Sequence, residues 1–244
     1  MKSYIQMSIR TKNETADWAI GEKLVESLSL SGGRLLPEQI SHNADKFSNN
    51  FIDSSSIRDC WAAEEIFDVN GVQSVLYRDF AWRRRRSVKS IGSVVHTFRN
   101  LRGQVVPGSI SLRASYSDEV DWMVVFRRWC EIFEPQLGML HLFTAPELHP
   151  DNLNDSFQIG SFNSALSPEV PNIGWSMFYG DDFSREVDDE RIRSMGFSVE
   201  SLMGGRLVTV TKEIGDIVAD FSLFDRRRAE LKRLFRNGFF LVDC

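Results

Sequence analysis

The segment from Asp118 to Pro135 constrains the fold more than any other part of the sequence. It carries a wide apolar stripe at helical spacing, with charged side chains on the opposite face and a proline at its end. The stripe consists of Trp122, Val125, Phe126, Trp129 and Phe133. Acidic residues favour the start of a helix and the position before proline disfavours helical geometry. The pattern therefore predicts a core helix that Ser117 caps and Pro135 stops.

Strand patterns lie on both sides of this segment. Apolar and polar residues alternate from Ile110 to Tyr116, which is the period of a half-buried strand. The continuous apolar run from Leu137 to Phe143 predicts a buried strand. Alternation and turn signals predict further strands around residues 5–9, 175–179, 197–202 and 206–211. We therefore expect an α+β fold with a mostly antiparallel sheet flanked by helices.

Three other segments favour helices. They run from about Trp18 to Leu28, from Ile57 to Ile66 with Asn70-Gly71 as the stop, and from about Ser222 to Asn237. The sequence contains no internal repeat and no linker-like segment, so we expect a single domain over residues 1–244.

Composition narrows the class of protein. No window approaches the roughly 18 consecutive apolar residues of a membrane helix, and the first residues lack the apolar core of a secretory signal. Cys60, Cys130 and Cys244 are widely separated, which fits free thiols in a reducing compartment. We therefore expect a cytoplasmic protein. The net charge of −5 disfavours a general nucleic-acid binder and favours either a basic partner or simply solubility.

Motifs for catalysis are missing from the sequence. The four histidines have no spacing that places two metal ligands on one helix face, and the glycines form no phosphate-binding loop. We assign no catalytic, cofactor-binding or metal-ligating residues, expect no cofactor, and predict that the protein is not an enzyme. Two alternatives stay open: a metal-dependent hydrolase or nuclease that uses Asp181, Asp182 and His141, and a nucleic-acid-binding module that uses Arg83 to Arg86.

An acidic cluster follows an aromatic strand pattern in the C-terminal third. Aromatic anchors beside carboxylates combine the burial typical of binding hot spots with electrostatic steering of a basic partner, although a solvated turn would carry the same charges. A nuclease, which must itself bind phosphate, is such a partner. The predicted interface consists of Trp175, Tyr179, Asp181, Asp182, Glu186, Asp188, Asp189 and Glu190.

The same third of the chain resembles a known family. Gly174-Trp175 is followed by Phe178-Tyr179, and a predicted hairpin with its turn at Gly204-Gly205 leads into an apolar strand that ends in Thr209 and Thr211. This order is similar to that of bacterial immunity protein family fifty-two, which occurs in polymorphic-toxin and type VI secretion loci. The resemblance covers roughly residues 174–240. The acidic insertion and the arginine-rich terminal helix depart from the family pattern.

The resemblance implies a function for the chain. An immunity protein is a cytoplasmic antitoxin that binds a cognate secreted toxin, often a restriction-endonuclease-like nuclease, and neutralises it by stoichiometric protein–protein interaction. Such a protein contacts neither nucleic acid nor membrane directly. The resemblance leaves the identity of the toxin, the mode of inhibition and the oligomeric state open.

Overall fold

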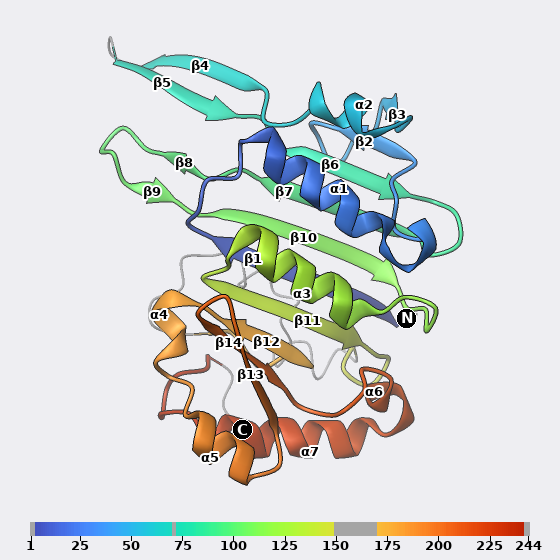
Figure 1. The fold of residues 1–244 in the computed structure, drawn as a ribbon, viewed down its shortest axis with the longest axis vertical. Helices are drawn as coiled ribbons and strands as arrows, with labels where there is room; N and C mark the ends of the chain where they lie inside the picture. Colours follow the sequence, from blue (N-terminus) through green and yellow to red (C-terminus); the bar gives the residue numbers. More distant parts are fainter. Residues whose placement is uncertain (1–2, 70–71, 149–169, 242–244) are drawn as a thin grey trace. The chain divides into compact units, whose positions relative to one another are not determined.

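The computed structural model describes residues 3–69, 72–148 and 170–241 (Figure 1). The chain divides into two compact units. The first unit combines the N-terminal residues up to Ser8 with the chain from Gln136 onward, and the second spans Ile9–Pro135. Strand β1 (Tyr4–Thr11) contributes residues to both. The predicted α+β class with mostly antiparallel strands and flanking helices is confirmed. The single domain over residues 1–244 stays a prediction.

The second unit is built on antiparallel strands in the order β10-β7-β6-β2-β3, with helices packed on them. The strands are β2 (Gln39–Ser41), β3 (Asn49–Asn50), β6 (Phe80–Arg84), β7 (Ser90–Val95) and β10 (Gly108–Ser115). The helices are α1 (Trp18–Gly33), α2 (Ser54–Arg58) and α3 (Trp122–Phe133). Two further two-stranded sheets are the hairpins β4 (Glu64–Val69) with β5 (Val72–Tyr77), and β8 (Phe98–Arg99) with β9 (Val105–Val106).

An aromatic cluster forms the core of this unit. Trp82 on β6 is fully buried and lies directly opposite Gly92 on β7, which leaves room for the indole ring. Its ring contacts that of Trp129 on α3 edge-on, with centroids 6.3 Å apart. The indole N–H of Trp129 donates to the hydroxyl of Ser27 on α1 at 2.9 Å, so one side chain ties both helices to the sheet.

The central helix of this unit begins later than predicted. Asp121 caps α3 by accepting a hydrogen bond from the N–H of Val124, and the helix starts at Trp122. Ser117 instead accepts a hydrogen bond from the Trp122 indole through its carbonyl group. The helix ends at Phe133 because Glu134 takes a left-handed conformation before Pro135.

The first unit contains antiparallel strands in the order β13-β14-β12-β11. These strands are β11 (Leu137–Phe143), β12 (Ser176–Tyr179), β13 (Ser198–Leu202) and β14 (Gly205–Thr209). The helices are α4 (Asp181–Ser184), α5 (Asp189–Ser194), α6 (Asp216–Ala219) and α7 (Phe221–Lys232). Every residue of β11 and β12 is buried, so both strands are covered on both faces.

Two local predictions are wrong. The helix predicted from Ile57 to Ile66 is a short α2 followed by strand β4, because β4 pairs with β5 in a hairpin register. The turn predicted at Gly204-Gly205 lies one residue earlier, where Met203 and Gly204 both have positive φ. Gly205 is the first residue of β14, and a Cβ there would lie 2.5 Å from the Phe178 ring, so its glycine serves packing.

Two of the three cysteines lie in the described part of the chain. Cys60 and Cys130 are buried free thiols, and burial raises the pKa of Cys130. Cys244 and Asn70-Gly71 lie outside the described residues. In the described part of the chain, no helix has the length and apolar character needed to cross a membrane.

Candidate functional site

The two aromatic residues predicted as interface anchors belong to the core of the first unit. Trp175 is 3% exposed, and its indole N–H donates to the Thr211 hydroxyl at 3.0 Å. Tyr179 is fully buried against Phe235 and Phe239, which raises the pKa of its phenol. Both rings are therefore buried in this structure, and their role in an interface stays a prediction.

The acidic cluster lies on and around α5, where much of its charge is used within the chain. Both carboxylate oxygens of Asp189 accept hydrogen bonds from Nε of Arg206 on β14 at 2.9 Å. Glu186 forms an ion pair with Arg236 at 2.9 Å. Asp189 therefore ties α5 to β14, and Glu186 ties the segment before α5 to the chain after α7.

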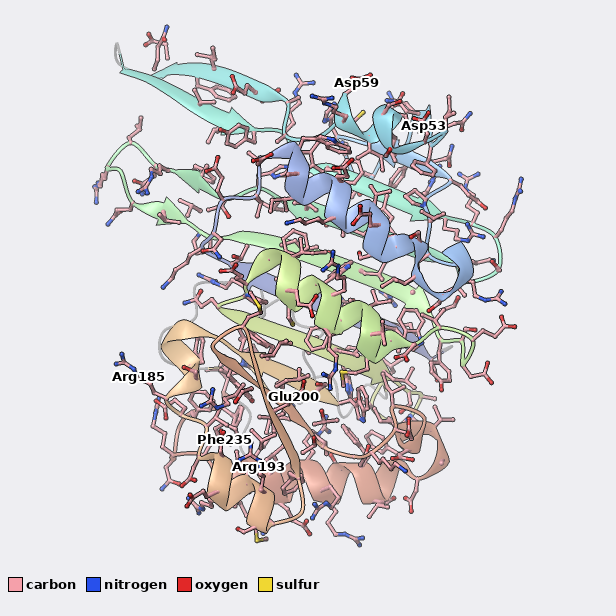
Figure 2. The ribbon with its side chains drawn as sticks, in the orientation of Figure 1. Asp53, Asp59, Arg185, Arg193, Glu200 and Phe235 are labelled. Carbon is pink, nitrogen blue, oxygen red and sulfur yellow. The ribbon has the colours of Figure 1, made fainter. Side chains whose placement is uncertain are left out.

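The remaining acids of the predicted interface have three different placements. Asp188 caps α5 by accepting a hydrogen bond from the N–H of Arg191 at 3.0 Å. Glu190 is exposed in the first turn of the same helix. Asp181 and Asp182 begin α4, and their side chains lie outside the described part of the structure. Arginines surround the cluster: Arg185 extends from the end of α4 and Arg193 lies on α5 (Figure 2).

Removal of Asp189 tests this structural role. We expect Asp189→Ala to lower the free energy of unfolding by about 1 kcal/mol, because the paired Arg206 is only partly solvated. Glu190→Ala, in the next position and exposed, should change it by less than about 0.5 kcal/mol. Urea denaturation of both variants measures the difference. Equal stability would mean that the Asp189 ion pair is as weak as a solvated surface pair.

The arginine run predicted as an alternative nucleic-acid contact also makes internal contacts. Nε of Arg83 donates to the side-chain oxygen of Gln39 at 2.8 Å, and its guanidinium lies 4.4 Å from the centre of the Phe47 ring. Arg84 donates to the carbonyl of Leu36. The first two arginines of the run therefore anchor the edge of the second unit's sheet.

His141, named in the alternative hydrolase hypothesis, belongs to a buried ion network in the first unit. Its Nδ1 accepts the backbone N–H of Trp175 at 3.0 Å, so the ring proton lies on Nε2, which donates to Glu147 at 2.7 Å. The other Glu147 oxygen accepts from Arg228 on α7 at 2.6 Å. A second nitrogen of Arg228 donates to Asp225 at 2.6 Å.

Glu147 stays ionised in this network despite its burial. Burial alone would raise the pKa of its carboxyl group, but the contacts with His141 and Arg228 outweigh burial and lower that pKa to about 2. The network fixes the start of the chain after β11 to helix α7. Within residues 3–69, 72–148 and 170–241, no group of three or more His, Cys, Asp and Glu side chains is placed to hold a metal ion.

An exposed apolar surface lies on the two hairpins of the second unit and was missed in the sequence. Ile66 is 64% exposed and Leu101 is 56% exposed, which are large exposed fractions for apolar side chains. We call this the hairpin surface: it consists of Ile66, Val75, Leu101 and Val105, with Phe67 on the opposite face of the β4–β5 hairpin. Both hairpins project from the same side of the second unit (Figure 1).

A groove separates the two hairpins. It has a volume of about 580 Å³ and is lined by Val75 and Tyr77 from β5 and by Phe98, Leu101 and Val105 from the β8–β9 hairpin. Lys12, Glu14 and Arg99 place charges along it. A concave, partly apolar site with charged residues along it can hold a segment of a protein partner. The signal that could have found it is Asn70-Gly71 between apolar residues, a typical hairpin sequence.

Comparison with known proteins gives no match: no family model and no curated protein sequence matches the chain.

Proposed function

We propose that this protein is an immunity protein that binds a secreted toxin stoichiometrically in the cytoplasm and silences it. The hairpin surface is the observation that carries the proposal, because large apolar side chains held on projecting hairpins are typical of a surface that a partner covers. Acidic residues on the same hairpin, including Glu64 and Asp68, favour a basic partner. A nuclease is such a partner, because it must itself bind phosphate.

The proposed interface therefore differs from the one predicted in the sequence. It lies on the hairpin surface of the second unit, and the acids around α5 have a structural role. A contact of about 800 Å² on each partner is typical of stable complexes and is larger than the hairpins' five apolar residues provide. The groove between the hairpins and the acidic residues of β4 would supply the rest.

Co-expression with the product of the adjacent open reading frame tests the function. We expect the neighbour to kill cells alone, to spare them together with this protein, and to copurify with it in a fixed ratio. A harmless neighbour, or a pair that never associates, would contradict the proposed function.

The hairpin surface can be tested separately with purified components. We expect the double variant Ile66→Ser and Leu101→Ser to bind the neighbour at least tenfold more weakly, because burying each apolar side chain contributes about 1.5–3 kcal/mol. Its free energy of unfolding should hardly change, since both side chains are exposed. Val218→Ser, at an exposed apolar position on α6, is the matched control. Equal affinities, measured by calorimetry, would place the interface elsewhere.

A further inference from the structure

The register of the β4–β5 hairpin shows which backbone groups of β4 face outward. The N–H of Arg78 donates to the carbonyl of Ala63 at 2.8 Å, which makes these two residues a hydrogen-bonded pair. Hydrogen-bonded and non-hydrogen-bonded pairs alternate along an antiparallel ladder. The pairs Glu64–Tyr77 and Ile66–Val75 are therefore non-hydrogen-bonded. The N–H and C=O groups of Glu64 and Ile66 therefore point away from β5.

That outer side is the edge of the two-stranded sheet. In the part of the chain that the structure describes, β5 is the neighbour of β4 in the strand order, and β4 has no second neighbour. Ile66 and Phe67, at the centre of β4, are both exposed. Natural sheets normally protect a long exposed edge with charges, proline or a bulge, because an open edge pairs readily with another chain. The edge of β4 carries Glu64, Glu65 and Asp68, which protect it against another acidic strand, while its outward N–H and C=O groups can pair with a strand of complementary charge.

The side chains of β4 define the strand that would fit. Glu64, Ile66 and Asp68 share one face, because successive side chains of a strand alternate between faces. A strand added to this edge places its own residues directly opposite these three on the same face. The complementary sequence is basic, any residue, apolar, any residue, basic.

The charges of β4 disfavour a second copy of the protein as the strand that pairs with this edge. Antiparallel pairing of two β4 strands centred on Ile66 places Glu64 of one copy opposite Asp68 of the other. Like charges directly opposite each other destabilise a sheet. The acidic residues therefore disfavour self-association and favour a basic segment.

We infer that the outer edge of β4 binds an extended segment of the partner by strand addition, and that this segment alternates basic and apolar residues. The inference rests on the proposed function, since it names the mode of contact and the chemistry of the toxin's docking segment. Backbone hydrogen bonds supply affinity in this mode, and Glu64, Ile66 and Asp68 select the sequence.

Amide hydrogen exchange of the full chain with a synthetic peptide tests strand addition without the toxin. The probe is a blocked peptide Thr-Lys-Thr-Val-Thr-Lys-Thr at millimolar concentration, and the control replaces both Lys with Glu. We expect the lysine peptide to slow exchange about tenfold at Glu64 and Ile66, whose amides face outward. Exchange at Glu65 and Phe67, which bond to β5, should hardly change. Uniform or absent protection would overturn the inference.

Two variants make the test independent of a folding defect. Ile66→Pro removes one outward N–H and leaves the bonds to β5, so it should abolish the protection, whereas Ile66→Val should retain it. The double variant Glu64→Lys and Asp68→Lys should reverse the preference and bind the glutamate peptide. Unchanged preference would contradict the role of these charges. Protection that appears without peptide, together with a doubled mass in light scattering, would identify a second copy as the occupant and overturn the inference.

These outcomes are distinguishable from those of the co-expression test. Peptide binding with a harmless neighbouring gene product would leave strand addition standing and remove the antitoxin function. Neutralisation of the toxin without peptide protection would support the antitoxin function and overturn strand addition.

Discussion

Replacement of Arg228 by methionine is expected to lower the free energy of unfolding by about 3–5 kcal/mol. The Arg228 guanidinium neutralises the Glu147 carboxylate inside the core of the first unit, and both side chains are almost fully buried. Removal of one partner leaves an uncompensated buried charge, which costs far more than the loss of a surface pair. Urea denaturation at neutral pH measures the change. Arg226→Met, at an exposed position two residues earlier on α7, should have little effect.

A double variant separates the lost charge from lost packing. Arg228→Met combined with Glu147→Gln removes both ions and keeps an oxygen that can accept the Nε2–H of His141. We expect this variant to recover a substantial part of the stability, because replacing a whole buried ion pair is much less costly than breaking it. No recovery would mean that the packing of the Arg228 side chain is responsible.

The same network makes the stability depend on pH in a defined direction. The pKa of Glu147 is about 2 in the folded protein against an ordinary value of 4.5. A lowered carboxyl pKa contributes stability that is fully present above pH 4.5 and is lost as pH falls through about 2. The contribution at neutral pH is roughly 3 kcal/mol. The stability gap between Arg228→Met and the unsubstituted protein should therefore narrow between pH 5 and pH 2, and a gap that is constant with pH would contradict this explanation.

The second large effect is expected at Gly92 in the other unit. A Cβ at this position would lie 2.2 Å from the Trp82 ring, and that ring is fully buried between Phe80 and Trp129. Because the ring cannot move into solvent, we expect Gly92→Ala to destabilise the protein by about 3 kcal/mol. Thermal and urea denaturation measure the loss. Gly103→Ala provides the contrast, because its Cβ would meet nothing within 4 Å and any loss would come from its φ of +73°, a strain that Gly92 lacks since its φ is not positive.

A second substitution tests whether the clash with Trp82 is the cause. The indole nitrogen of Trp82 has no hydrogen-bond partner among the described residues, so Trp82→Phe removes ring volume without breaking a hydrogen bond. In the Gly92→Ala background we expect Trp82→Phe to cost much less than it does alone. Additive effects of the two substitutions would show that the damage arises elsewhere.

The sequence predicted those elements whose apolar pattern is wide or unbroken. Helix α3 and strand β11 follow directly from their patterns, because burial on one helix face or on both strand faces needs no knowledge of the partner. The helix prediction around Ile66 was wrong because its sequence pattern is ambiguous. Apolar residues at helical spacing followed by Asn-Gly fit the end of a helix and the turn of a β-hairpin equally well.

The surroundings of the predicted interface residues could not be read from the sequence because they depend on distant residues. The sequence pattern placed Tyr179 in a predicted interface, but Phe235 and Phe239 from the end of the chain cover it. The α5 acids looked like a free anionic patch, but Arg206 lies 17 residues from Asp189 and Arg236 lies 50 residues from Glu186. A local pattern shows which side chains are charged or apolar, but tertiary contacts decide whether those side chains are exposed to solvent.

The division into two units gives the protein a built-in optical reporter. Five of its six tryptophans lie in the second unit, where Trp82 and Trp129 meet edge-on, and Trp175 lies in the first. Intrinsic fluorescence therefore follows mainly the second unit. A Trp175→Phe protein confines that signal to the second unit, and a protein with Trp175 as its sole tryptophan follows the first. Time-resolved refolding of the two proteins would show which unit folds first, without any added label.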